Sequence, residues 1–353
     1  MTAPPGAPSV AVWVLGAGAW GTAFALRLAQ RDQGVRVGLW GRDPDQILDC
    51  KAQGENRRYL PGHRLPESLA LFSELDEALA QWRGNLGPRL LVLATPVAGL
   101  SELAEQIRSR LGAAQAGEGV VSLSKGIAKQ GDYLVWPSTI LSTAMPGWRF
   151  GALSGPSFAD EVARGLPLAL TLASKDIDWA RQTAKHLHGN GLRIYSSADL
   201  VGVELGGAIK NVLAIAAGAL DQLGLGANAR AALITRGLAE AARLGRALGA
   251  QPETFLGLAA LGDLVLTCTG DLSRNRRVGM GLAKGESLEQ VLQSLGHVAE
   301  GVRTAPVMLE LARSRGVEVP ITAAVNQVLE GRQTVEEAIE GLMARSAVDE
   351  NNL

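Results

Sequence analysis

Short apolar runs alternate with amphipathic segments along the first half of the chain. The apolar runs are continuous, and glycine, proline or serine residues bound them. Such runs are typical of strands that are buried on both faces of a parallel sheet, with helices between them. We therefore predict strands at residues 10–15, 35–40, 90–94, 120–123, 150–153 and 168–172, and helices at 22–30 and 100–111. This order predicts a doubly wound parallel sheet of the α/β class.

The pattern changes after about residue 195. From Asp199 onward the apolar residues recur with helical spacing, and no strand-like run is found. Two pairs with capping-box spacing and two prolines indicate helix starts: Ser287 with Gln290, Thr334 with Glu337, Pro252 and Pro320. We therefore predict a dinucleotide-binding domain at 10–195, an all-helical substrate-binding domain at 196–353, a hinge at 193–197 and a flexible leader at 1–9.

Composition excludes several classes of partner. The 34 basic and 35 acidic residues nearly cancel, and aromatic residues make up only 4%, so we expect no nucleic-acid partner. The longest apolar stretch, 212–220, is too short to span a bilayer, and the leader lacks the features of a signal peptide. Two cysteines without metal or redox spacing suit the cytoplasm. The sequence leaves the oligomeric state open, with a homodimer as one option.

A glycine motif after the first predicted strand indicates a dinucleotide site. Gly16, Gly18 and Gly21 form a GxGxxG pattern directly before the helical segment that begins at Thr22. The first glycine permits a tight turn, the second lets backbone amides approach the pyrophosphate, and the third allows close helix packing. Its place between a strand and a helix disfavours the alternative, an incidental glycine-rich turn. The motif predicts a Rossmann-type domain that binds NAD or NADP.

The end of the second predicted strand indicates which dinucleotide is preferred. An NAD-specific site usually has an acidic residue there, which binds the ribose 2′-hydroxyl. Here Gly41 leaves room, and Arg42 offers a planar cation suited to a 2′-phosphate. In the alternative interpretation, Arg42 is a solvated loop residue and Asp43 contacts the ribose. The sequence favours NADP.

Lys210 is the strongest candidate for acid–base chemistry. It lies beside Asn211 inside the strongly apolar helical segment 203–220. A lysine in such a segment either extends to the surface or is held for chemistry. Reduction of a carbonyl needs a proton donor beside the ketone oxygen, and desolvation near a second cation lowers the pKa of a lysine towards neutrality.

A lone carboxylate and a group of donors follow in the same half of the chain. Asp263 is set among apolar residues and needs a partner, for which Lys210 is the obvious candidate. Ser273, Arg274 and Asn275 offer hydroxyl, guanidinium and amide donors together, as a phosphate monoester requires. Taken alone, this group fits a basic helix start on the surface equally well. The 4 histidines have no metal-binding spacing, so we expect no metal.

Several motifs, in the same order, resemble those of the bacterial NAD(P)-dependent glycerol-3-phosphate dehydrogenases. The similarity runs from about residue 10 to about residue 343. Its markers are 16–21 (GAGAWG), Asn56 with 59–62 (YLPG), 124–126 (SKG), 154–159 (SGPSFA), 209–212 (IKNV), 261–264 (LGDL), 273–275 (SRN) and 298–301 (VAEG).

The resemblance implies a role for each matching position. Lys210 would be the proton donor and acceptor at the substrate's C2 oxygen. Substrate contacts would come from Lys125, Gly155, Ser157, Lys210, Asn211, Asp263, Ser273, Arg274 and Asn275. Cofactor contacts would come from Gly16, Gly18, Ala19, Trp20, Gly21, Arg42, Lys125, Ala159, Arg274, Val298 and Glu300. Ala19 stands where the family often has serine, so backbone contacts would survive there and a hydroxyl contact would not.

Together these features predict an enzyme that reduces dihydroxyacetone phosphate to sn-glycerol 3-phosphate for glycerophospholipid synthesis. Asp263 would orient Lys210, Lys125 would add positive charge near the oxygen, and Arg274 with Asn275 would hold the phosphate. Two alternatives stay open: another two-domain NAD(P)-dependent dehydrogenase of ketoacids or sugar acids, and a non-catalytic module that senses NAD(P). The joint presence of the lysine, the carboxylate and the phosphate donors favours the enzyme over the sensor.

Overall fold

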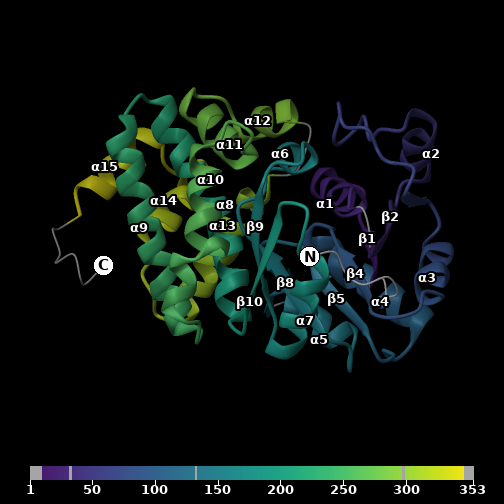
Figure 1. The fold of residues 1–353 in the computed structure, drawn as a ribbon. Coiled ribbons are helices and arrows are strands. Elements are labelled where there is room, and N and C mark those ends of the chain that lie inside the picture. The colour runs from purple at the N-terminus through teal and green to yellow at the C-terminus, as the bar shows by residue number, and fades with distance from the viewer. Residues whose placement is uncertain (1–9, 32–33, 132, 296–298, 346–353) are drawn as a thin grey trace. The chain divides into compact units, whose positions relative to one another are not determined.

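The computed structural model describes residues 10–31, 34–131, 133–295 and 299–345 (Figure 1). The chain folds into two compact units. The first unit comprises Met1–Ser124, Pro137–Leu153 and Ser157–Leu200, and the second comprises Lys125–Trp136, Ser154–Pro156 and Val201–Leu353. The predicted leader, residues 1–9, lies outside the described residues.

An eight-stranded sheet forms the centre of the first unit, in the order β10-β9-β8-β5-β4-β1-β2-β3. The strands are β1 (Val10–Leu15), β2 (Val35–Trp40), β3 (Leu69–Phe72), β4 (Arg89–Leu93), β5 (Glu118–Ser122), β8 (Phe150–Ser154), β9 (Leu168–Ala173) and β10 (Leu192–Ser197). The pairs β1–β2, β2–β3, β1–β4, β4–β5, β5–β8 and β9–β10 are parallel. The chain runs from β1 outward to β3 and returns to β4 on the other side of β1. The strand order therefore reverses between β1 and β4, and the predicted doubly wound fold is confirmed.

The helices of the first unit bury the apolar faces that the sequence pattern indicates. They are α1 (Ala19–Ala29), α2 (Pro44–Gln53), α3 (Leu75–Arg83), η1 (Val97–Gly99), α4 (Leu100–Leu111), α5 (Pro137–Ala144), α6 (Ala159–Ala163) and α7 (Ile177–Leu187). Helix α4 buries Leu100, Leu103, Ala104 and Ile107, which is the spacing of one helical face. Because α1 and α3 both contact β1, that strand is buried along its whole length.

The second unit is built on helices. These are α8 (Leu200–Gln222), α9 (Gly226–Ala247), η2 (Pro252–Leu256), η3 (Leu258–Gly262), α10 (Asp263–Thr269), α11 (Arg274–Ala283), α12 (Leu288–Leu295), α13 (Glu300–Ser314), α14 (Pro320–Leu329) and α15 (Val335–Met343). The described residues from Asp199 onward contain no strand, as predicted. Both predicted capping boxes are present, at the starts of α12 and α15. Pro320 opens α14 as expected, whereas Pro252 opens the short 3₁₀ helix η2.

The sequence analysis missed three pieces of strand structure. The hairpin of β6 (Ala128–Gln130) and β7 (Tyr133–Val135) belongs to the second unit, where Ile127 joins the helical core. The edge strands β3 and β10 were also missed. In β10, buried Leu192 and Ile194 alternate with exposed Arg193 and Tyr195, so no continuous apolar run marks it. The predicted hinge at 193–197 is therefore strand, and the predicted boundary at 195/196 falls inside it.

Helix α8 is the most apolar helix of the second unit. By length and composition alone it would suffice to cross a membrane, with a mean hydropathy of 1.6. However, 83% of its most apolar window is buried inside the structure, as is typical of a core helix. The residues around Lys210 are therefore packed against other helices.

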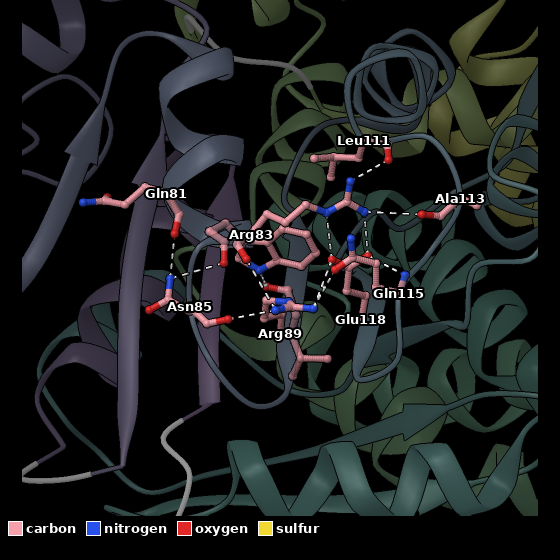
Figure 2. Close-up of polar contacts among 10 residues, drawn as sticks. Gln81, Arg83, Asn85, Arg89, Leu111, Ala113, Gln115 and Glu118 are labelled. Atoms are coloured by element: carbon pink, nitrogen blue, oxygen red, sulfur yellow. Dashed lines mark hydrogen bonds and ion pairs between the residues drawn. The ribbon is translucent and has the colours of Figure 1, made fainter.

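A buried carboxylate forms a network of ion pairs and hydrogen bonds at the amino-terminal edge of the sheet (Figure 2). Glu118, the first residue of β5, accepts hydrogen bonds from Arg83 Nε at 3.0 Å and Arg83 Nη2 at 2.8 Å. Its Oε2 also accepts a bond from the backbone N–H of Gln115 at 2.8 Å, and Arg89 lies 3.4 Å from its Oε1. Burial alone would raise the pKa of Glu118, but the bonds from Arg83 and Gln115 outweigh it and hold the pKa below its ordinary value. This network stabilises the edge opposite the glycine motif.

Candidate active site

The glycine motif lies at the point where the strand order reverses. Gly16 has φ +128°, and a Cβ atom there would lie 2.7 Å from the carbonyl oxygen of Ala94, at the end of β4. A Cβ on Gly21 would lie 2.0 Å from the carbonyl oxygen of Gly16, whereas the space around Gly18 is open. No side chain caps the start of α1, and its first turn has no acidic residue. These features fit a dinucleotide pyrophosphate, because the N–H groups of the first turn are available to an anion.

Two amide side chains hold the glycine turn from behind. Asn56 is buried and donates hydrogen bonds to Ala17 O at 2.9 Å and to Thr22 Oγ1 at 2.8 Å. Gln46 donates to the same Ala17 carbonyl at 2.7 Å. The sequence analysis quoted Asn56 only as a family marker and missed Gln46. Their contacts identify both as positioning residues of the turn.

Two buried donors close to this turn are unsatisfied. Trp20 Nε1 and Thr95 Oγ1 are buried without a hydrogen-bond partner among the described residues. Thr95 follows β4, and its carbonyl oxygen accepts a bond from Ser124 Oγ at 2.6 Å, so the ends of β4 and β5 do converge. Unpaired buried donors are uncommon in folded proteins, so these two mark the surroundings of the glycine turn as a place where polar groups are unsatisfied.

The two charged residues after β2, Arg42 and Asp43, differ in their hydrogen bonds and ion pairs. Asp43 caps α2 by accepting bonds from the N–H groups of Asp45 and Gln46, and it forms an ion pair with Arg58 at 2.8 Å. Arg42 is exposed and has no ion pair or hydrogen bond with any described residue. The side chain of Arg42 is therefore available to a ligand, whereas the carboxylate of Asp43 is occupied.

The second unit brings together the two lysines and the carboxylate that the sequence analysis singled out. Lys210 Nζ lies 2.6 Å from Asp263 Oδ1, and Lys125 Nζ lies 2.6 Å from Asp263 Oδ2. Lys125 also donates to Gly155 O at 3.2 Å, and Lys210 donates to Thr267 Oγ1 at 3.1 Å. Thr267 Oγ1 lies 2.6 Å from the carbonyl oxygen of Asp263, to which it donates its proton. Thr267 is a member of the cluster that sequence reasoning missed, although it lies one helical turn after Asp263.

The charges in this cluster are strongly coupled. Asp263 is only 1% exposed, so its two ion pairs are shielded from water. Burial lowers the pKa of Lys210 to about 8; Asp263 opposes this by stabilising the ammonium, and Lys125 adds to it. An ammonium group has three N–H bonds, and two are used on each lysine. One N–H on each lysine therefore remains for an oxygen atom outside the described residues.

Local structure places these side chains. Asp263 begins α10 directly after the π-helical turn η3, a kind of turn that often lies at functional sites. Gly207 lies one turn before Lys210 on α8, and a Cβ there would approach Ser154 Oγ to 3.0 Å and Lys125 Cγ to 3.5 Å. The glycine thus allows the Lys125 side chain to cross α8.

The predicted phosphate donors divide into structural and free groups. Ser273 is the N-cap of α11, and its hydroxyl accepts from Arg276 N. Asn275 Nδ2 donates to Asn211 Oδ1 at 2.9 Å, while Asn275 Oδ1 accepts from the N–H of Gly301 at 2.9 Å. These bonds join α8, α11 and the start of α13.

Arg274 is the first residue of α11, and its side chain is exposed. Although part of this side chain meets water, the surrounding protein desolvates the guanidinium and lowers the pKa of Arg274, and Glu300, the first residue of α13, opposes this effect. Of the remaining predicted residues, Ser157 and Ala159 belong to the first unit, and Val298 lies outside the described residues. Among the described residues, no group of three His, Cys, Asp or Glu side chains could hold a metal ion.

Comparisons with known proteins show the family to which the chain belongs. The sequence profile of the NAD-dependent glycerol-3-phosphate dehydrogenase N-terminus matches residues 11–180, and that of the C-terminus matches residues 199–340. The chain belongs to this family. It is an NAD(P)-dependent oxidoreductase, which confirms the expected class of enzyme and cofactor.

Individual relatives cover nearly the whole chain. A glycerol-3-phosphate dehydrogenase [NAD(P)+] from Dechloromonas aromatica is 51% identical over 96% of this chain and 99% of its own length. One from Methylibium petroleiphilum is 52% identical over 95% of this chain and 97% of its own length. The crystal structure of glycerol-3-phosphate dehydrogenase from Coxiella burnetii matches with a TM-score of 0.86 and 37% identity, over 96% of this chain and 99% of that one.

Proposed function

We propose that the chain reduces dihydroxyacetone phosphate to sn-glycerol 3-phosphate in the cytoplasm, for glycerophospholipid synthesis. The observation that carries this proposal is the buried Asp263 carboxylate between two ammonium groups, each with one N–H left over. Two such donors stabilise the negative charge that develops on a carbonyl oxygen during reduction. A module that only senses NAD(P) has no need of this arrangement.

Residues of the first unit would hold the cofactor. The N–H groups at the start of α1 face the pyrophosphate, and Asn56 with Gln46 keeps the turn in shape. NAD(P)H, when bound, supplies the hydride that adds to the substrate carbon. Arg42 favours NADPH, because its free guanidinium suits the 2′-phosphate while Asp43 is occupied by α2 and Arg58.

Lys210 supplies the proton. As hydride adds to C2 of the ketone, the carbonyl electron pair moves onto the oxygen, and Lys210 Nζ transfers a proton to that oxygen. The neutral lysine then takes a proton from solvent, which a pKa of about 8 permits at physiological pH. Lys125 keeps a positive charge beside the oxygen, and Asp263 with Thr267 directs Lys210.

Arg274 anchors the substrate phosphate at the start of α11. Its exposed guanidinium and the N-terminal N–H groups of the helix both favour a phosphate dianion. Asn275 and Asn211 hold each other and Gly301, so we assign them mainly to positioning. Binding energy at the phosphate then orients the carbonyl at the other end of the substrate.

The proton-donor role is tested with Lys210→Met. Turnover of dihydroxyacetone phosphate should fall by about 10²–10⁴-fold, while NADPH affinity stays unchanged. Lys129→Met is the matched control, because Lys129 is an exposed lysine of the same unit, paired with Glu310. If Lys210→Met keeps more than about a tenth of wild-type turnover, Lys210 is not the acid.

The anchor role is tested with Arg274→Ala. KM for dihydroxyacetone phosphate should rise and kcat should fall, with a loss in kcat/KM of about 2–4 kcal/mol. Unphosphorylated dihydroxyacetone should be a poor substrate of both enzymes and hardly worse for the variant. Arg277→Ala, on the same helix, is the control, and NADPH affinity is measured in parallel. An equal loss on both substrates would contradict the role.

A further inference from the structure

A second arginine, Arg58, lies beside the end of β2. Its Nη1 donates to Asp43 Oδ2 at 2.8 Å. The other oxygen of this carboxylate accepts bonds from the N–H groups of Asp45 at 3.2 Å and Gln46 at 3.4 Å. One carboxylate oxygen is therefore engaged by α2 and the other by Arg58. The two side chains of the ion pair are 59% and 44% exposed, so the pair stabilises the fold little, and both charges meet solvent.

The segment that carries Arg58 is attached to the glycine turn. Asn56, which donates to the carbonyl oxygen of Ala17, also accepts a bond from the N–H of Tyr59 at 3.3 Å. The guanidinium of Arg58 lies over the Tyr59 ring, 5.2 Å from its centroid. Contacts with the ring and with the carboxylate of Asp43 thus hold Arg58 in a defined place, two residues after the side chain that positions the glycine turn.

Asp43 stands where an NAD-specific site has its acidic residue. It follows the end of β2 and lies about 20 residues after the glycine motif, which is the usual spacing. Gly41, two positions earlier, packs against the glycine turn, since a Cβ there would lie 3.0 Å from Ala17 Cβ. A free carboxylate at this place accepts the ribose 2′-hydroxyl of NAD and repels a 2′-phosphate. The ion pair with Arg58 offsets this repulsion and occupies the carboxylate oxygen that α2 leaves over.

We propose that Arg58 sets the cofactor preference by neutralising Asp43, so that this end of β2 accepts a 2′-phosphate. Arg42, Asp43 and Arg58 are two cations and one anion, with a net charge of +1. Without Arg58 the net charge is zero, and the carboxylate is open to a ribose hydroxyl. Arg58 is therefore a positioning residue, which acts on the cofactor through Asp43. This inference rests on the NADPH preference in the proposed function and adds the residue that creates it.

The test measures Kd for NADPH and for NADH by fluorescence titration without substrate, so its result does not depend on which ketone the enzyme reduces. In Arg58→Met, NADPH should bind about tenfold more weakly, and NADH at least as tightly as in the wild type. The change in the ratio of the two Kd values tests Arg58 whichever cofactor the wild type prefers. Arg57→Met is the matched control, because Arg57 is the exposed arginine at the preceding position, and it should leave this ratio unchanged.

Asp43→Asn shows whether Arg58 acts through Asp43. Asparagine still caps a helix well but carries no charge, so Arg58→Met should no longer weaken NADPH binding in this background. Arg58→Lys keeps the cation and should retain most of the wild-type ratio. If Arg58→Met weakens NADPH binding equally with and without the Asp43 charge, Arg58 binds the phosphate directly and the proposal is wrong. An unchanged ratio of Kd values in Arg58→Met also overturns it.

Discussion

Replacement of Asp263 by asparagine should move the pH at which Lys210, the proposed proton donor, loses its proton. In the wild type, the pKa of Lys210 is about 8, so the rate of ketone reduction should fall as the pH rises through 8. Asp263 accepts from Lys210 and Lys125 at 2.6 Å each, and it is the group that stabilises the Lys210 ammonium. Asparagine keeps the size of the side chain and removes the charge.

The expected size of the effect follows from these contacts. An opposite charge at this distance changes a pKa by about 1–3 pH units, and Lys125 remains to repel the proton on Lys210. A fall of the Lys210 pKa from about 8 to about 6 lowers the protonated fraction at pH 7.5 by about 25-fold. The corresponding free energy is about 1.4 kcal/mol for each pH unit.

The assay is NADPH oxidation with dihydroxyacetone phosphate, measured as kcat/KM from pH 5.5 to 9.5. Both enzymes use the same substrate, so its ionisation cancels in the ratio of variant to wild type. Asp221→Asn is the matched control, because Asp221 also binds two cations, Arg230 at 2.5 Å and Arg276 at 2.7 Å, away from both lysines. The control variant should be less stable than the wild type, but its kcat/KM should still fall with rising pH near pH 8. If kcat/KM falls at the same pH in Asp263→Asn and in the wild type, the reasoning is refuted.

Three further predictions concern the cofactor and stability. Arg42→Ala should weaken NADPH use about tenfold and leave NADH kinetics unchanged, and equal losses for both cofactors would contradict the assigned preference. Glu118→Gln should lower the free energy of unfolding at pH 7 by about 3–5 kcal/mol, because Arg83 loses a buried partner. Since the pKa of Glu118 is held below its ordinary value, the difference should shrink below about pH 4.5 in urea unfolding experiments. Burial raises the pKa of Glu240 to about 7, although it accepts a bond from Ile321 N. Between about pH 4.5 and 7, the free energy of unfolding of the wild type should therefore fall by up to about 3 kcal/mol relative to that of Glu240→Gln. Parallel curves of unfolding free energy against pH for the two proteins would rule this out.

The central strands could be predicted from sequence because burial on both faces leaves a signature along the chain. The bounds of β1 and β2 agree with the predicted 10–15 and 35–40 to the residue. Edge strands carry no such signature, since one face meets solvent and polar residues interrupt the run. That is why β10 was taken for a hinge, and why the β6–β7 hairpin escaped notice.

The kinds of chemistry in the candidate site were also readable from local sequence. The glycines before α1 and a lysine inside an apolar helix are conspicuous because they break a local rule of composition. Local sequence does not tell which of these side chains contact one another in the folded chain. Lys125 and Asp263 are separated by 138 positions, yet their side chains lie 2.6 Å apart.

Only the tertiary structure decided those partnerships, because side-chain contacts and desolvation depend on atoms that the fold brings together. By itself the sequence determined a doubly wound sheet and a helical second half, and it singled out Lys210 as a charged residue inside an apolar helix. The packing of α8 against α10 decided that Lys210 is buried beside Asp263 and Thr267, with its pKa lowered to about 8. The tertiary structure likewise decided that Asn56 holds the glycine turn and that Arg58 forms an ion pair with Asp43. Burial turns an ordinary side chain into a strained or reactive one, and burial is a property of the folded chain alone.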